Sequence, residues 1–195
     1  MTPRDDSRTT LTTAASMRVL AHPTRLRLLG LLRERGAQTA AQLGDVIDEA
    51  PGTVSYHLAK LAAFDLIEPA EGHSSDRRER WWHATSTLTS WEPVDLLDDP
   101  EKLMASAALQ KSIAQVYAAR FSEYIDATPT MAREWVAAGT SSDRSLRLTA
   151  VEMGAMRAEL EALVAKWLDV SSAHDSADTD GAEAVVVVYQ TYRRP

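Results

Sequence analysis

Residues 51–64 read Pro-Gly-Thr-Val-Ser-Tyr-His-Leu-Ala-Lys-Leu-Ala-Ala-Phe, and this stretch decides the fold. Pro51 suits the first position of a helix, where its missing N–H is not needed. Val54, Leu58 and Leu61 are spaced i, i+4 and i+7, so they form one narrow apolar stripe that we expect to face the core. The opposite face and its flanks carry Gly52, Thr53, Ser55, Tyr56, His57 and Lys60.

The segment before this helix predicts a second, short helix at a steep angle to it. Thr39 and Gln42 match a capping box, in which each side chain serves a backbone N–H of the other residue. The short helix is expected to end near Ile47, which leaves residues 48–50 as a three-residue turn. Short helix, turn and helix are the parts of a helix-turn-helix.

Further elements are expected on both sides. Upstream, residues 11–20 predict a short helix, and residues 24–35 predict a central buried helix that stops at Gly36. Downstream, Leu66 begins a strand, residues 72–76 have turn composition, and the aromatic segment 80–84 predicts the returning strand. The hairpin would carry Arg77 and Arg78 at its tip. The order of elements indicates a winged helix.

Residues 17–84 resemble the winged helix-turn-helix of the ArsR family of bacterial transcriptional regulators. The resemblance is carried by Leu-Ala-His-Pro-Thr-Arg-Leu-Arg-Leu-Leu at 20–29, Thr-Val-Ser-Tyr-His-Leu-Ala-Lys-Leu at 53–61, and Leu66-Ile67. It implies that residues 51–64 form the recognition helix. The family often has glycine where Asp65 stands, but Asp tolerates the left-handed conformation that such a position requires. The chain also continues for about 100 residues beyond the part that the resemblance covers.

The resemblance and the helix pattern together predict a DNA-binding site. The recognition helix lacks Arg, Asn and Gln on its exposed face, so only Lys60 can address guanine directly. We therefore expect modest base readout, with phosphate contacts and DNA shape contributing much of the binding. The predicted DNA-binding residues are Thr39, Gln42, Thr53, Ser55, Tyr56, His57, Lys60, Arg77, Arg78 and Arg80.

The domain organisation follows from these segments. We expect a disordered N-terminus at 1–10, the DNA-binding domain at 11–86, and a mostly helical region at 99–195 for dimerisation or effector binding. The predicted fold class is mainly α, or α+β, with a winged helix-turn-helix and a helical C-terminal region that has a small β element. A strand is predicted at 185–192, with 145–148 as its pairing candidate, and a flexible loop at 171–183.

The long helix expected at 100–126 is the candidate seam of a homodimer, together with the helix at 11–20. A dimer would place two recognition helices on two half-sites about one helical turn apart. Packing of the long helix within its own chain is the alternative.

Charge is unevenly distributed along the chain, whose net charge is −7. Residues 1–90 carry 11 basic and 11 acidic side chains, whereas residues 91–195 carry 10 and 17. The acidic excess therefore lies entirely in the second part. Phosphate binding needs a local basic surface rather than a basic protein, so DNA binding remains compatible with this balance. The excess also keeps open an alternative, a protein-interaction module that has the winged fold but does not bind DNA.

Composition and sequence motifs argue against several other functional classes. The chain has no cysteine, and its five histidines show no ligand spacing, so we expect no metal and no cofactor. No enzyme motif is recognisable, and the polar N-terminus and short apolar runs predict a cytoplasmic protein without a membrane span. A small organic effector is an open expectation. Its pocket could be lined by Trp81, Trp82, Trp91, Trp135, Trp167, Met153, Met156, Tyr117 and Tyr124.

Overall fold

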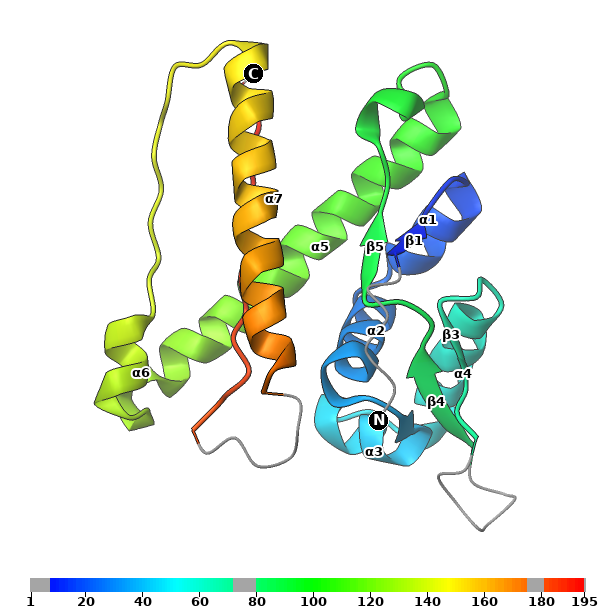
Figure 1. The fold of residues 1–195 in the computed structure, drawn as a ribbon. Helices are drawn as coiled ribbons and strands as arrows, with labels where there is room; N and C mark the ends of the chain where they lie inside the picture. The colour runs from blue at the N-terminus through cyan, green and yellow to red at the C-terminus, as the bar shows by residue number, and fades with distance from the viewer. Residues whose placement is uncertain (1–7, 72–79, 175–180, 195) are drawn as a thin grey trace. The chain divides into compact units, whose positions relative to one another are not determined.

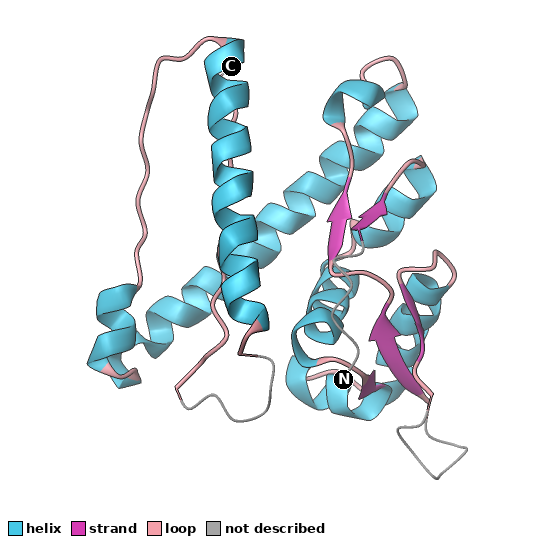
Figure 2. Cartoon of the chain, in the orientation of Figure 1, coloured by secondary structure: helices cyan, strands magenta, loops and turns pink. Residues whose placement is uncertain are grey.

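The computed structural model describes residues 8–71, 80–174 and 181–194. The chain divides into two compact units, Met1–Asp126 and Ala127–Pro195. The elements of the first unit, in chain order, are β1 (Arg8–Thr10), α1 (Ala14–Leu20), α2 (Pro23–Arg35), β2 (Gln38–Thr39), α3 (Ala40–Ile47), α4 (Pro51–Ala62), β3 (Ile67–Pro69), β4 (Trp81–Ala84), β5 (Leu88–Ser90), the 3-10 helix η1 (Pro93–Leu96) and α5 (Pro100–Ala127) (Figures 1 and 2).

Helix boundaries in this unit follow from local chemistry. The ring Nδ1 of His22 accepts a hydrogen bond from the Thr24 N–H, and Pro23 occupies the first turn, so α2 begins there. Gly36 ends α2 with a φ of 75°, a conformation that glycine adopts without a steric penalty. Both hydrogen bonds of the predicted capping box are present at the start of α3: Thr39 N–H to Gln42 Oε1 at 2.9 Å and Gln42 N–H to Thr39 Oγ1 at 3.2 Å.

The turn between α3 and α4 is tight. Asp48 ends α3 in the left-handed region with a φ of 57°, and the Glu49 N–H donates to the Gly44 carbonyl at 3.0 Å. A Cβ at Gly44 would lie 2.5 Å from the Glu49 carbonyl oxygen, so only glycine fits there without a shift of the backbone. The predicted helix, three-residue turn and helix are therefore confirmed.

The apolar stripe of α4 faces the core, as the spacing predicts. Val54, Leu58 and Leu61 are each 0% exposed and pack with Leu28 of α2 and Met17 of α1. Burying each such side chain contributes about 1.5–3 kcal/mol relative to leaving it in water. This burial fixes which side of α4 is left for solvent.

Two small sheets complete the first unit. The three-stranded sheet has the order β2-β4-β3, with both pairs antiparallel and Ile67 opposite Ala84. Asp65, just before β3, has a φ of 55°, which agrees with the expected tolerance of Asp for this conformation. The hairpin of β3 and β4 lies beside α4 (Figure 2), and its tip falls outside the described residues.

The second sheet corrects one expectation. Arg8–Thr10, predicted to be disordered, form β1 and pair in parallel with Leu88–Ser90, in the segment between the two predicted domains. The polar composition of residues 8–10 does not reveal this pairing, because the backbone hydrogen bonds of a strand are made to a neighbouring strand. Residues 1–7 lie outside the described residues.

Helix α5 joins the core through its first turns. Leu109 and Ala105 are buried, and the Ser112 hydroxyl donates to the Ala21 carbonyl at 2.6 Å. Arg120 pairs with Glu34 of α2 at 2.6 Å. Further along, Tyr117 and Phe121 are 38% and 44% exposed. The first half of α5 therefore packs within the chain, and the second half leaves apolar surface open.

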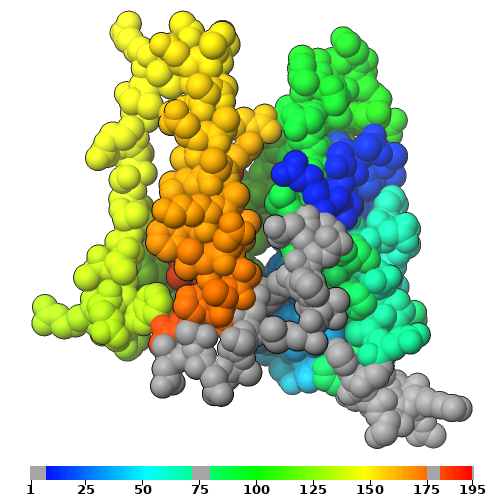
Figure 3. Space-filling view, viewed as in Figure 1, coloured from blue at the N-terminus to red at the C-terminus, as the bar shows by residue number. Residues whose placement is uncertain are grey.

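The second unit contains the 3-10 helix η2 (Thr128–Thr130), α6 (Arg133–Ala138) and α7 (Ala150–Ser172). The capping box of Thr149 and Glu152 is present at the start of α7. No residue of α7 is buried, and the helix is coloured yellow to orange in Figure 3. The fold class predicted from the sequence, mainly α with a winged helix-turn-helix and a helical C-terminal region, is confirmed, but the described strands all lie in the first unit and none in the C-terminal region.

The predicted strand at 185–192 is wrong. Neither residues 185–192 nor residues 145–148 are in a strand, and Val185 and Tyr192 are 70% and 75% exposed. A run of β-branched residues becomes a strand only where a neighbouring strand accepts its hydrogen bonds. Of the loop predicted at 171–183, Ser171 and Ser172 instead belong to α7, and residues 175–180 lie outside the described residues. In the described part of the chain, no helix is long and apolar enough to cross a membrane.

Candidate nucleic-acid interface

The exposed face of α4 gathers three side chains with hydrogen-bonding groups. Thr53, Tyr56 and Lys60 lie opposite the buried stripe and are exposed, Tyr56 to 57%. The Lys60 ammonium lies 5.6 Å from the centre of the Tyr56 ring, a distance at which a cation and an aromatic face attract. Ser55 is also exposed on the flank of this face. A 12-residue helix with this exposed face has the dimensions that the major groove admits.

The first turn of α4 provides donors that the sequence analysis did not include. Ala50 precedes the helix and supplies no side-chain cap, so the N–H groups of Gly52 and Thr53 are not used by a capping side chain. Uncapped N–H groups at a helix N-terminus are suited to a phosphate oxygen. The signal in the sequence is an alanine at the cap position, where Ser, Thr, Asp or Asn is usual.

His57 does not lie on the exposed face, which corrects its predicted role in DNA contact. Its side chain is buried, with 7% exposed, and its ring centre lies 4.7 Å from that of His22. Burial lowers the pKa of His57, and the positive charges of His22 and Arg25 lower it further. Burial also lowers the pKa of His22, with a further contribution from Arg25. The neutral form of both rings is therefore favoured, and His57 packs α4 against the start of α2.

Thr39 is also unsuited to contact DNA. It is 3% exposed, and its hydroxyl accepts from the Gln42 N–H. Its role is to start α3. Gln42 itself is exposed, and although its carbonyl oxygen serves Thr39, its amide NH₂ group still carries donors.

The hairpin beside α4 carries one of the arginines predicted to bind DNA among its described residues. Arg80 is exposed, and its guanidinium lies 4.3 Å from the centre of the Trp82 ring, so the side chain is held against β4. His83 and Glu68 form a cross-strand ion pair at 3.0 Å when His83 is protonated. Arg77 and Arg78 lie outside the described residues.

Over residues 8–71, 80–174 and 181–194, no three His, Asp or Glu side chains lie close enough to hold a metal ion. The candidate site is thus an exposed helix face with neighbouring backbone donors and an adjacent β-hairpin.

These features define a winged helix-turn-helix, the class of domain that places one helix against nucleic acid. Residues 20–70 match the family model described as a helix-turn-helix domain. This match agrees with the helix-turn-helix that was expected from the sequence.

Solved structures similar to this chain include transcriptional regulators. A mutant of ZitR from Lactococcus lactis in apo form is 18% identical, with 76% of this chain and 83% of that chain covered and a TM-score of 0.32. The YusO protein from Bacillus subtilis is 17% identical, with 77% and 79% covered and a TM-score of 0.34. A transcriptional regulator homologue from Pyrococcus horikoshii is 19% identical, with 52% and 86% covered and a TM-score of 0.32. No curated protein matches the chain.

Proposed function

We propose that this protein is a DNA-binding transcriptional regulator that inserts α4 into the major groove and rests its hairpin on the DNA backbone. The observation that carries the proposal is the exposed face of α4, where Thr53, Tyr56 and Lys60 lie opposite a stripe that is fully buried. A helix that is fixed to the core on one side and presents hydrogen-bonding groups on the other can bind a groove without rearrangement.

The contacts divide into two kinds. Lys60 can donate to guanine, while Thr53 and Tyr56 offer single hydrogen bonds or contact with a thymine methyl group. The uncapped N–H groups of Gly52 and Thr53, together with Arg80 and the predicted wing residues Arg77 and Arg78, are suited to phosphates. The first kind determines sequence preference, and the second determines affinity for any duplex.

We further propose that the regulator is a homodimeric repressor. The exposed apolar side chains of the second half of α5, among them Tyr117, Phe121 and Ile125, are the candidate seam. The helix α1 is a weaker contributor than the sequence suggests, because Ala14, Met17 and Leu20 are all used by the chain's own core. A dimer bound over a promoter would exclude the polymerase sterically.

The proposal is tested by selecting bound fragments from sheared genomic DNA with the full chain, followed by titration of the selected site. Lys60→Met should weaken binding to the selected site roughly tenfold, within the range for loss of one good base contact. Lys166→Met is the matched control. Lys166 lies 5.7 Å from the Trp167 ring, much as Lys60 lies against Tyr56, but on α7, so its loss should leave DNA affinity unchanged.

The wing is tested by salt dependence. Replacing both Arg77 and Arg78 with glutamine should weaken binding to all sequences and reduce the slope of log affinity against log salt by about 0.9 for each lost phosphate contact. A slope unchanged by the double replacement would remove the wing from the interface.

Two outcomes would redirect the proposal. If no fragment is enriched and the full chain binds no duplex at low salt, the alternative of a winged protein-interaction module applies, as the net charge of −7 allows. If light scattering at micromolar concentration gives the mass of one chain, the homodimer is refuted. In a dimer, Phe121→Glu should produce the monomer by placing a charge in the seam.

A further inference from the structure

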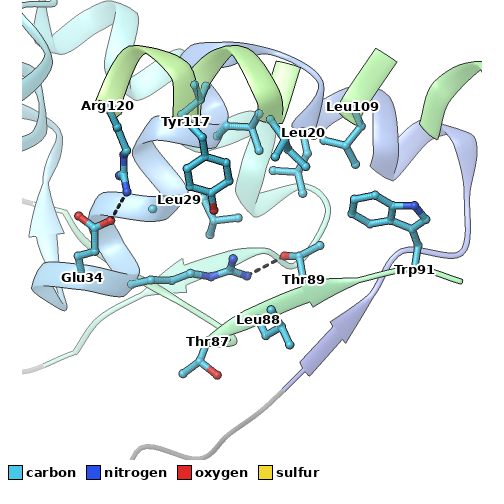
Figure 4. Close-up of a pocket in the computed structure, with 15 residues that line it drawn as sticks. Leu20, Leu29, Glu34, Thr87, Leu88, Thr89, Trp91, Leu109, Tyr117 and Arg120 are labelled. Carbon is cyan, nitrogen blue, oxygen red and sulfur yellow. Dashed lines mark hydrogen bonds and ion pairs between the residues drawn. The ribbon is translucent and has the colours of Figure 1, made fainter. Parts of the chain in front are cut away.

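A cavity of about 280 Å³ opens in the first unit between α2, β5 and the middle of α5 (Figure 4). Its walls are mainly aliphatic, with two aromatic rings: Trp91 follows β5 directly, and Tyr117 comes from α5. The apolar lining residues include Leu20, Leu29, Leu88, Leu109 and Ile113. Of the aromatic and methionine residues expected to line an effector pocket, only Trp91 and Tyr117 line this cavity.

One end of this cavity is cationic. Arg33 and Arg120 both line it, together with Glu34, so this end has two guanidinium groups and one carboxylate. Arg120 and Glu34 satisfy each other at 2.6 Å. Among the described residues, Arg33 has only neutral partners: it donates to the Ser86 carbonyl at 2.8 Å, to the Ser86 hydroxyl at 3.3 Å and to the Thr89 hydroxyl at 2.7 Å.

Arg33 is therefore a desolvated cation without an anionic partner among the described residues. Burial lowers its pKa to about 10, and the neighbouring Tyr117 opposes this only in part. A charge taken out of water is normally matched by an opposite charge nearby. These three hydrogen bonds use Nε and Nη2, which leaves the Nη1 donors for a further acceptor.

Helix α2 also leaves room at this end of the cavity. Gly30 lies in the middle of α2, where glycine costs about 1 kcal/mol relative to alanine. A Cβ at this position would lie 3.1 Å from a guanidinium nitrogen of Arg120. The missing side chain thus keeps both the cavity and the Arg120–Glu34 pair in place.

We propose that this cavity binds a small organic carboxylate with an aromatic or aliphatic body, its carboxylate on Arg33 and its body between Trp91, Tyr117 and the surrounding leucines. A carboxylate fits better than a phosphate, because a dianion with a large hydration shell gains nothing from aliphatic walls. The planar guanidinium matches the planar carboxylate.

The cavity is connected to α4 through helix α2. Helix α2 forms one wall of the cavity and packs directly against α4 through core residues such as Leu28 and Leu58. Occupation of the cavity would therefore alter DNA affinity. This regulatory part rests on the proposed function, whereas ligand binding itself does not.

The test is calorimetric titration of the full chain with benzoate, phenylacetate and hexanoate, each paired with its neutral amide. At least one carboxylate should bind saturably, and its amide at least tenfold more weakly. Arg33→Gln should weaken carboxylate binding roughly tenfold to a hundredfold, as expected for loss of a hydrogen bond to a charged group. Arg27→Gln, at an exposed position on the same helix, should have no effect.

Arg33 also donates a hydrogen bond to Thr89 of β5, so its replacement affects the fold as well as the cavity. If Arg33→Gln does not fold, Gly30→Leu provides a second test of the cavity. Leucine favours the helix and fills the cavity, so this variant should fold and lose carboxylate binding. Binding by none of the three carboxylates, equal binding of acids and amides, or unchanged binding by Gly30→Leu would each overturn the proposal.

The regulatory part is tested separately, by adding the bound carboxylate to the complex with selected DNA. A change in DNA affinity of at least fivefold, absent in Gly30→Leu, supports it. Unchanged DNA affinity at saturating carboxylate overturns the regulatory part alone. Failure of the unliganded chain to bind any duplex overturns the proposed function and leaves the carboxylate site standing.

Discussion

The turn between α3 and α4 depends on the absence of a side chain at Gly44, and replacing this glycine with alanine should destabilise the domain. The new Cβ would lie 2.5 Å from the Glu49 carbonyl oxygen and 3.7 Å from a methyl group of Val54. To reach an ordinary contact of 3.4 Å, the two backbones must separate by about 0.9 Å. The Glu49 N–H bond to the Gly44 carbonyl resists this movement.

The expected cost follows from three contributions. Forcing a methyl group into a closed space costs about 1–3 kcal/mol. Weakening the turn hydrogen bond adds about 1 kcal/mol. Alanine favours helix α3 over glycine by up to about 1 kcal/mol, which offsets part of this. The net loss is about 2 kcal/mol, which corresponds to a fall in Tm of roughly 6–10 °C for a unit of this size.

Thermal unfolding and DNA titration of the full chain measure both consequences, since a shift of the turn also reorients α4. Gly52→Ala is the matched control for stability, because a Cβ there meets nothing within 4 Å and the midpoint should hold or rise slightly. A Gly44→Ala variant as stable as the parent would refute the argument that this close approach requires glycine.

Three further predictions concern the same domain. Leu58→Ala should lower the free energy of unfolding by about 2–5 kcal/mol in denaturant titration, because Leu58 is 0% exposed at the centre of the core; a loss under 1 kcal/mol would contradict that position. Thr39→Ala should cost about 1 kcal/mol through the lost cap, and Thr39→Ser should restore most of it, whereas equal stability of the two variants would exclude the capping role. Burial lowers the pKa of His22 and His57 below 6.5 in the folded chain, so the unfolded chain binds more protons at low pH. Stability should therefore be full above about pH 6.5 and fall as the pH drops below it. His57→Gln should flatten this decline in thermal scans, and a parent chain equally stable at pH 7.5 and 5.5 would contradict the prediction.

Helix α4 was predictable from the sequence because its two faces differ so clearly. Three apolar residues at i, i+4 and i+7 fix the inward direction, and the position of Tyr56 and Lys60 follows from helix geometry alone. The same geometry placed His57 on a flank, where its exposure depends on a neighbour. His22, 35 positions earlier in the chain, covers it. No periodicity within α4 contains that information.

The effector pocket expected from aromatic and methionine residues stays a prediction, and of those residues only Trp91 and Tyr117 line the described cavity. Residues of this type occur throughout the chain, and a cavity depends on which elements leave space between them. The observed cavity is lined by Trp91 and Tyr117, and its chemistry comes from Arg33 and Gly30, neither of which stands out in the sequence.

By itself, the sequence determined the helix-turn-helix: the cap at Thr39, Pro51 in the first turn of α4, the apolar stripe and the exposed face all arise from interactions within a few residues. Contacts between distant segments decided the rest. β1 pairs with β5, residues 185–192 pair with no strand among the described residues, and Arg33 lies in a cavity beside β5 and α5. A strand needs a neighbour to accept its hydrogen bonds, and a buried charge becomes a binding group only when other elements exclude water from it, so both depend on tertiary structure.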